Sequence, residues 1–226
     1  MNNKTQNELT NIALFDLTKT IASPLFEITT YPHEVLPLIA EYIIKIGKTL
    51  DKTKYFNPEE GVHIHFSAKI DKSATIIPPA IICENAEIRK SAYLRGSAII
   101  GANSVVGNSV EVKNSIIFDG VQIPHFNYVG DSIFGENSHM GAGSVTSNVK
   151  ADKQNVVIKT KNGNIATNRK KVGAFVGGNA EIGCNVVLNP GTVIGKNTTV
   201  QPLASVRGYI CENSICKKNG EVVKKQ

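Results

Sequence analysis

Apolar runs and aromatic residues are scarce in this 226-residue chain, which has no Trp and only 6% aromatic residues. No stretch approaches the ~20 consecutive apolar residues of a membrane-spanning helix. The first thirty residues lack the basic start, apolar run and cleavage site of a secretion signal. We therefore expect a cytoplasmic protein with no membrane partner.

Cysteine is also rare, and the four cysteines form no CxxC pair. Reduced cytosolic thiols fit this scatter better than a disulfide framework or a zinc site. The net charge is +6, and many of the bases lie in Lys150–Lys171 and Lys217–Lys225. Because no aromatic residues interleave with these bases, we expect no nucleic-acid partner. Basic side chains in a cleft could still hold the phosphates of a substrate or cofactor.

A large apolar residue recurs at every sixth position in two blocks of the chain, residues 64–118 and 176–206. The members are Ile64, Ile70, Ile76, Ile82, Ile88, Leu94, Ile100, Val106, Val112 and Phe118, and then Val176, Ile182, Leu188, Ile194, Val200 and Val206. A period of six over so much chain indicates a solenoid rather than a helix or a single strand. Turn-forming residues between the apolar positions favour corners, and the apolar residues would stack from coil to coil. The sequence predicts an all-β fold, a parallel β-helix.

The chain divides into three parts by this repeat. Residues 1–61 lack it, and there Leu36, Ile39, Ile43 and Ile46 have helical spacing. We predict a helical N-terminal cap that covers the open end of the solenoid. The β-helix domain follows over residues 62–210 with an inserted loop at about 147–172, and residues 211–226 form a basic tail.

Polar residues gather where the repeat falters, between the two repeat blocks. His125, Tyr128, His139 and Asn148 lie there, and His125 follows a Pro at the position where an apolar residue of the repeat is expected. Solenoids often carry function on such interruptions. A lone His is more often structural than catalytic, so the spacing alone leaves both interpretations of His125 open.

The segment PHFNYVGDSIFGENSHMGAGSVTSN resembles the active-site segment of the acetyltransferase domain of bifunctional sugar-1-phosphate nucleotidylyltransferase/acetyltransferases. The later segment NRKKVGAFVGGNAEIGCNVVLNPGTVIG resembles the archaeal-type version, and SPLFEITTYPHEVLPLIAEYI resembles its interdomain helix. The nucleotidylyltransferase domain itself has no counterpart, so we expect no uridylyl transfer. The resemblance implies a left-handed β-helix of hexapeptide repeats, acetyl-CoA as co-substrate and a homotrimer with active sites between subunits.

The resemblance also implies roles for five residues of this chain. His125 matches the general base, and a His imidazole is mainly neutral at pH 7. Asn148 matches the amide that positions amine and thioester, and it would help to stabilise the oxyanion. Arg95, Lys113 and Tyr128 match contacts to the sugar phosphate. The implied reaction is direct N-acetylation of an amino-sugar phosphate such as glucosamine-1-phosphate, with no metal required.

Ala142 and Gly178 match positions that bind the cofactor, and Ala142 would contact the pantetheine arm. Two positions depart from the family pattern in the substrate site. His139 stands where the family has Asn, and Gln154 stands where it has Lys. The identity of the acceptor therefore stays open.

Three other functions remain possible from the sequence. A metal enzyme like the β-helical carbonic anhydrases needs three convergent His ligands, which His125, His139 and either His63 or His65 do not provide at suitable spacing. A non-catalytic trimeric scaffold would account for the departures at His139 and Gln154. An acyltransferase with the same residues could also act on a nucleotide-linked sugar or a non-sugar acceptor.

Overall fold

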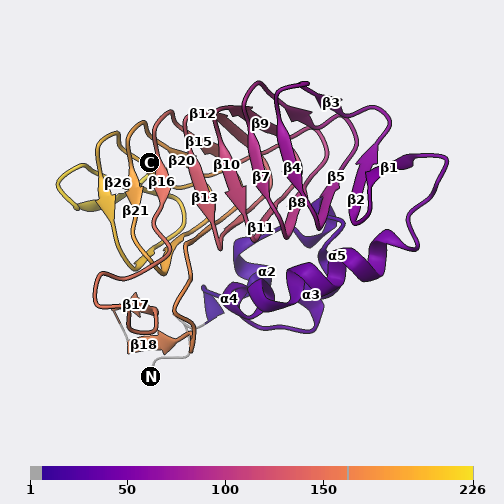
Figure 1. The fold of residues 1–226 in the computed structure, drawn as a ribbon. Helices are drawn as coiled ribbons and strands as arrows, with labels where there is room; N and C mark the ends of the chain where they lie inside the picture. The colour runs from indigo at the N-terminus through magenta and orange to yellow at the C-terminus, as the bar shows by residue number, and fades with distance from the viewer. Residues whose placement is uncertain (1–6, 162, 226) are drawn as a thin grey trace.

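The computed structural model describes residues 7–161 and 163–225 and shows a parallel β-helix flanked by short N-terminal helices (Figure 1). Each coil passes through three sheets, A, B and C, in turn, and the coils wind in the left-handed sense. The predicted fold class is confirmed, with the helical N-terminal segment and the insertion included.

The strands of sheet A are β1 (Tyr55–Glu59), β2 (Val62–His65), β5 (Ala80–Ile82), β8 (Ala98–Ile100), β11 (Ser115–Ile117), β14 (Ile133–Phe134), β19 (Ala174–Val176), β22 (Thr192–Ile194) and β25 (Tyr209–Ile210). Those of sheet B are β3 (Lys69–Ile70), β6 (Glu87–Ile88), β9 (Val105–Asn108), β12 (Gln122–His125), β15 (His139–Met140), β20 (Glu181–Ile182), β23 (Thr199–Val200), β26 (Ser214–Cys216) and β27 (Val222–Lys224). Those of sheet C are β4 (Thr75–Ile77), β7 (Tyr93–Arg95), β10 (Glu111–Lys113), β13 (Tyr128–Gly130), β16 (Val145–Thr146), β21 (Val187–Leu188) and β24 (Ser205–Val206). Only the terminal pairs β1–β2 and β26–β27 are antiparallel within these three sheets.

The inner apolar column departs from the six-residue count at one point. Ile117, and not Phe118, pairs with Ile100 of the preceding coil, so this coil has seventeen residues. The prediction that Phe118 belongs to the column is therefore wrong. Its ring instead packs against the N-terminal segment, with centroid distances of 5.1 Å to Phe15 and 5.3 Å to Phe26.

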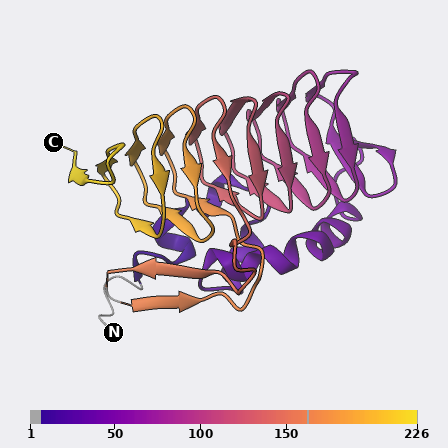
Figure 2. The same cartoon turned by 60° about the vertical axis from the view of Figure 1, so that its left-hand side comes forward.

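The N-terminal segment lies along sheet A and not over the end of the solenoid (Figures 1 and 2). Its helices are α2 (Asn11–Leu14), α3 (Ser23–Glu27), α4 (Pro32–Val35) and α5 (Ile39–Gly47), with 3-10 turns at Leu17–Lys19 and Leu36–Leu38. Helix α5 contacts β5 and β8. This placement differs from the predicted end cap because the outward side chains of sheet A, among them Ile81, Ile99 and Ile116, are apolar and fully buried.

The predicted helical spacing agrees with the burial in this segment. Leu36, Ile39 and Ile43 are buried, and Ile46 is partly buried against the core. The structure interrupts the helix with the 3-10 turn around Pro37, which has no backbone N–H to donate.

The insertion covers the other end of sheet A. Its strands β17 (Val157–Thr160) and β18 (Gly163–Ala166) form an antiparallel hairpin, and β17 contacts β22 and β25. Among the described residues, the N-terminal segment and this hairpin lie along sheet A and leave the outer faces of sheets B and C open (Figure 2). The side chains on the outer faces of sheets B and C are therefore not covered by these two segments.

A buried histidine in the N-terminal segment should make stability depend on pH. His33 is 6% exposed, and burial lowers its pKa, assisted by the Arg169 charge and opposed by Glu34. The unfolded chain therefore takes up a proton near pH 6.5, whereas the folded chain does so only at lower pH. We expect the melting temperature to fall as the pH is lowered from 7 to 5.

Replacing His33 by Gln should make this decrease shallower, as measured by thermal unfolding across the same pH range. It should not abolish the decrease, because burial also lowers the pKa of His63. Equal slopes in the variant and the parent would contradict the assignment to His33.

Candidate active site on sheet C

The outer face of sheet C brings the two predicted phosphate-binding residues side by side. Val112 of β10 pairs with Leu94 of β7 in parallel register, so the next residues, Lys113 and Arg95, are neighbours on adjacent strands. Lys113 in turn pairs with Gly130 of β13. The side chains of Arg95 and Lys113 thus lie next to each other on neighbouring coils, and Gly130 continues the row without a side chain.

Asp131 joins three side chains at the corner between sheets C and A. Lys113 Nζ lies 3.3 Å and 3.2 Å from its two carboxylate oxygens. Asn114 Nδ2 donates to Oδ1 at 2.8 Å, and Asn148 Nδ2 donates to Oδ2 at 2.6 Å. The Asp131 side chain is only 3% exposed. We call Lys113, Asn114, Asp131 and Asn148, with Tyr128, the Asp131 cluster.

Tyr128 completes the cluster from the start of β13. Its hydroxyl accepts a second hydrogen bond from Asn148 Nδ2, at 3.2 Å. A Cβ at position 130 would collide with this hydroxyl, so Gly130 is required for the ring to lie there. Burial raises the pKa of Tyr128, and the nearby charges of Glu111 and Asp131 act in the same direction. The phenol therefore stays protonated at neutral pH.

The orientation of Asn148 follows from its partners. A carboxylate only accepts hydrogen bonds, so the atom facing Asp131 Oδ2 must be the amide nitrogen. The same nitrogen donates to the hydroxyl of Tyr128. Among the described residues, Oδ1 of Asn148 has no partner, so the group left for a ligand is an acceptor. This differs from the oxyanion-stabilising role implied by the resemblance, because both N–H groups are already directed to the chain itself.

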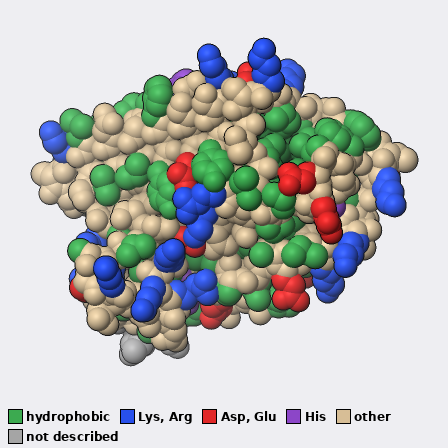
Figure 3. Space-filling view, in the orientation of Figure 1, with side chains coloured by type: hydrophobic (Ala, Val, Ile, Leu, Met, Phe, Trp, Pro, Cys, Tyr) green, Lys and Arg blue, Asp and Glu red, His purple; other side chains and the backbone are tan. Residues whose placement is uncertain are grey.

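The two predicted phosphate-binding residues are each paired with a carboxylate. Arg95 Nη1 lies 2.7 Å from Glu111 Oε1, and Lys113 is paired with Asp131. Figure 3, which views this face, shows acidic and basic side chains side by side among apolar ones. Two cations and two anions leave no net charge, so an anionic ligand would have to compete with these carboxylates.

His125 lies at the opposite edge of sheet C. It is the last residue of β12, it is exposed, and it pairs with Asn108 of the coil before. Three residues of β13, at ~3.3 Å per residue, separate this corner from Asp131. No hydrogen bond joins His125 to the Asp131 cluster among the described residues. One protomer therefore does not bring the two predicted catalytic residues, His125 and Asn148, together.

Asn127 holds the corner that carries His125. Its Oδ1 accepts from the backbone N–H of His125 at 3.1 Å, and its Nδ2 donates to the carbonyls of Gly141 at 2.8 Å and Ser144 at 3.1 Å. The side chain is buried, with the residue 3% exposed. Neither Asn127 nor Asp131 was predicted from the sequence to have a role, although both lie inside the segment that carries the resemblance.

The two predicted cofactor-binding residues lie at different corners. Ala142 lies beside His125, because the N–H of the next residue, Gly143, donates to the His125 carbonyl at 3.1 Å. Gly178 lies between sheets A and B, buried under the N-terminal segment, and donates to the Leu14 carbonyl at 3.1 Å. The structure places Ala142 with His125, whereas Gly178 lies apart from both.

His139 and Gln154 do not contact the Asp131 cluster. His139 lies on sheet B, where its Nδ1 is 3.0 Å from Glu181 Oε2. Gln154 is exposed in the insertion, and its backbone N–H donates to Asp152 Oδ1 at 3.0 Å. Within one protomer, the two residues that depart from the family pattern thus lie away from the Asp131 cluster.

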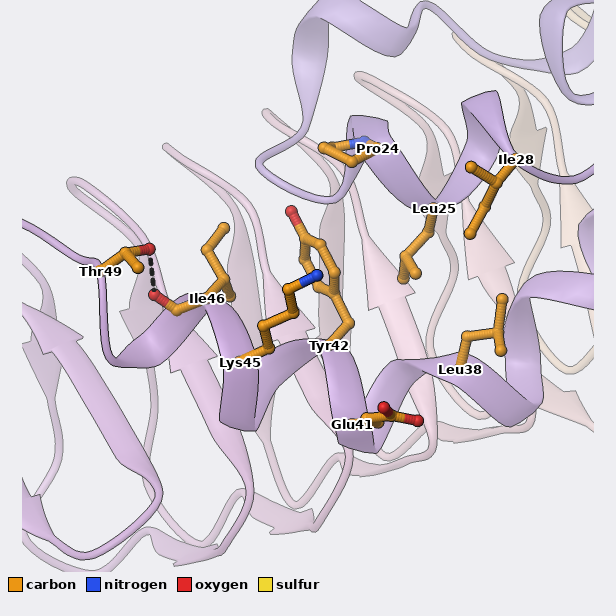
Figure 4. Close-up of a pocket in the computed structure, with 9 residues that line it drawn as sticks. All are labelled: Pro24, Leu25, Ile28, Leu38, Glu41, Tyr42, Lys45, Ile46 and Thr49. Carbon is orange, nitrogen blue, oxygen red and sulfur yellow. Dashed lines mark hydrogen bonds between the residues drawn. The ribbon is translucent and has the colours of Figure 1, made fainter.

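A pocket of about 540 Å³ lies between α3 and α5, away from the predicted site residues (Figure 4). Leu25, Ile28, Leu38 and Ile46 supply much of its apolar lining.

In residues 7–161 and 163–225, no three His, Cys, Asp or Glu side chains are arranged to hold a metal ion. The helices of the same residues are too short or too polar to cross a bilayer.

Part of the β-helix matches known proteins in sequence. The family described as GMPPB C-terminal domain matches residues 76–174. A bifunctional sugar-1-phosphate nucleotidylyltransferase/acetyltransferase of Sulfurisphaera tokodaii is 40% identical over 92 residues, which are 41% of this chain and 23% of that protein. The bifunctional protein GlmU of Methanococcus maripaludis is 36% identical over 109 residues, which are 48% of this chain and 26% of that protein.

Among solved structures, PerB from Caulobacter crescentus, in complex with CoA and GDP-perosamine, is 14% identical with a TM-score of 0.37. The match covers 72% of this chain and 56% of PerB. The chain spans about a quarter of the length of the two bifunctional relatives. Over the part that matches, the resemblance to bifunctional sugar-1-phosphate nucleotidylyltransferase/acetyltransferases is confirmed.

Proposed function

We propose that this chain is an acetyl-CoA-dependent N-acetyltransferase for an amino-sugar phosphate such as glucosamine-1-phosphate. The observation that carries the proposal is the shared face of sheet C. There Arg95, Lys113, Tyr128 and Asn148, matched to the family one by one, lie on neighbouring coils around Asp131. The named activities of the relatives that match the β-helix support the same class of reaction.

In the proposed reaction the acceptor amine attacks the thioester carbonyl of acetyl-CoA. The C–N bond forms, the C–S bond breaks, and His125 takes the amine proton and returns it to the CoA thiolate. Asn148 Oδ1 accepts a hydrogen bond from the amine and so directs its lone pair toward the carbonyl. Arg95 and Lys113 bind the phosphate of the sugar.

We also propose that the working unit is a homotrimer. His125 and Asn148 lie at opposite edges of sheet C, so a second protomer packed on this face could bring one subunit's His125 to the other's Asn148. The open faces of sheets B and C suit such packing, because sheet A is covered by its own chain. Light scattering should give three times the protomer mass of 24.4 kDa. A mass of one protomer would contradict the trimer.

The first test is release of CoA thiol from acetyl-CoA with a panel of acceptors. We expect release with glucosamine-1-phosphate or galactosamine-1-phosphate and none without an acceptor, and mass spectrometry should find the N-acetylated product. Silence with every acceptor, in protein that binds acetyl-CoA, would overturn the amino-sugar assignment. Failure to bind acetyl-CoA at all would favour the non-catalytic scaffold.

A second candidate is an acetyltransferase for an acceptor with a different charge. The pairs Arg95–Glu111 and Lys113–Asp131 leave no net positive charge for a phosphate dianion. The panel should therefore include unphosphorylated glucosamine and the UDP-linked amino sugars. A kcat/KM for either that exceeds the value for glucosamine-1-phosphate would identify this second candidate.

A further inference from the structure

Asp131 is a buried carboxylate that contacts two of the residues matched to the family's site, Lys113 and Asn148. Its side chain, 3% exposed, receives Lys113 Nζ and the amide nitrogens of Asn114 and Asn148. A buried carboxylate must be compensated by donors, and these three side chains supply them. The same contacts orient the three donors, because each side chain must direct an N–H group toward the carboxylate.

The contact to Asn148 decides which end of that amide faces the ligand. With a carboxylate on one side, only the NH2 group can point inward, and Oδ1 must point away. If position 131 were an amide, either end of Asn148 could face it. Tyr128 cannot fix the choice alone, since its hydroxyl can both donate and accept.

We propose that Asp131 is a positioning residue that presents Asn148 Oδ1 as the acceptor for the substrate amine and holds Lys113 in place. This inference rests on the proposed N-acetyltransferase function. The amine donates an N–H to Oδ1, which leaves its lone pair free to attack the thioester. Asp131 itself touches neither substrate, and it acts through Asn148 and Lys113.

The kinetic test is Asp131→Asn, which keeps the shape and removes the charge. We expect kcat to fall by about tenfold to a hundredfold, the loss that one charge-assisted hydrogen bond carries. The KM for acetyl-CoA should stay within about twofold. A kcat of Asp131→Asn equal to that of the parent enzyme would overturn the proposal.

The swap of the two residues distinguishes orientation from mere support of the fold. In Asp131→Asn combined with Asn148→Asp, an amide again faces a carboxylate, and position 148 presents an oxygen to the ligand. We expect the double variant to recover at least about tenfold in kcat over Asp131→Asn, a coupling of the size seen for contacting residues. A double variant no more active than the single one would contradict the orienting role.

Asp119→Asn is the matched control, because Asp119 accepts the backbone N–H of Ala102 at 2.7 Å and lies at the corner between sheets A and B. It removes one partly buried carboxylate and should leave kcat unchanged. An equal loss of kcat in Asp119→Asn and Asp131→Asn would show that removing any partly buried carboxylate lowers kcat. It would overturn the specific role of Asp131.

A measurement without turnover separates this inference from the proposed function. The side-chain NH2 resonances of Asn148, assigned by their disappearance in Asn148→Asp, should shift and exchange faster with water in Asp131→Asn and not in Asp119→Asn. Unchanged resonances in Asp131→Asn would overturn the positioning role even if the enzyme is active. Shifted resonances in a protein that acetylates nothing in the panel would support the orientation of Asn148 while the N-acetyltransferase assignment fails.

Discussion

Replacing His125 by Ala is expected to lower kcat for acetyl transfer by about 10²- to 10⁴-fold, the range of one positioned general base. His125 is exposed at the corner between sheets B and C, and its side chain makes no hydrogen bond within the described residues. The substitution should therefore leave the melting temperature unchanged. Steady-state kinetics at saturating acetyl-CoA, with thermal unfolding of the same sample, measures both.

His65→Ala is a suitable control for this variant. His65 also lies on the solenoid, hydrogen-bonded to Ser67 Oγ at 2.8 Å, but it stands far from the proposed site in the chain and on sheet A. Its loss should not change kcat. Near-parental turnover in His125→Ala would remove the general base from the mechanism, whatever the acceptor proves to be.

The repeat made the β-helix predictable because its signal is local and is repeated in each coil. A residue of the inner column, such as Ile100, is recognised by its spacing alone. The position of Phe118 could not be found in this way, because one coil is shorter by a residue and the count of six runs past Ile117. The shorter coil leaves no mark on the apolar pattern of the sequence, because Phe118 and Ile117, which takes its place in the column, are both apolar.

A second pattern could have placed the N-terminal segment. In sheet A most strands have two adjacent apolar residues, as in Ile81–Ile82 and Ile99–Ile100, whereas in β10 of sheet C both neighbours of the inward residue are polar. Sheet C has such pairs in β4 and β21, but their outward residues, Ile77 and Val187, are exposed. Adjacent apolar residues face both sides of a strand and indicate a sheet that is covered on its outer face. The larger number of such pairs in sheet A therefore favours helices along this sheet rather than over the open end.

The Asp131 cluster was only partly predictable. This coil has seventeen residues and pairs Lys113 with Gly130, so Asp131 lies one position past the register partner, and only the approximate proximity of the ion pair follows from the repeat. The contact of Asp131 with Asn148 does not, because it depends on how the chain turns from β16 into the insertion. The corner positions of His125 and Asn148, and thus the gap between them, also needed the structure.

Replacing Phe118 by Ala is expected to lower the free energy of unfolding by about 3–5 kcal/mol, the usual cost of deleting a buried Phe ring. The ring is fully buried and joins the solenoid to Phe15 and Phe26 of the N-terminal segment. Loss of the ring should leave a cavity between the solenoid and the N-terminal segment, and the segment should unfold locally before the solenoid does. Urea unfolding gives the free energy, and amide hydrogen exchange should show faster exchange in α2 and α3 than in the inner strands.

Phe126→Ala makes the same chemical change on a ring that is 64% exposed, and it should alter the free energy of unfolding by no more than about 0.5 kcal/mol. The difference between the two variants isolates the contribution of burial from that of the residue type. If Phe118→Ala proved as stable as Phe126→Ala, the aromatic contact could not be what holds the N-terminal segment to the β-helix. The alternative would then be the contact of α5 with β5 and β8, through the outward isoleucines of sheet A.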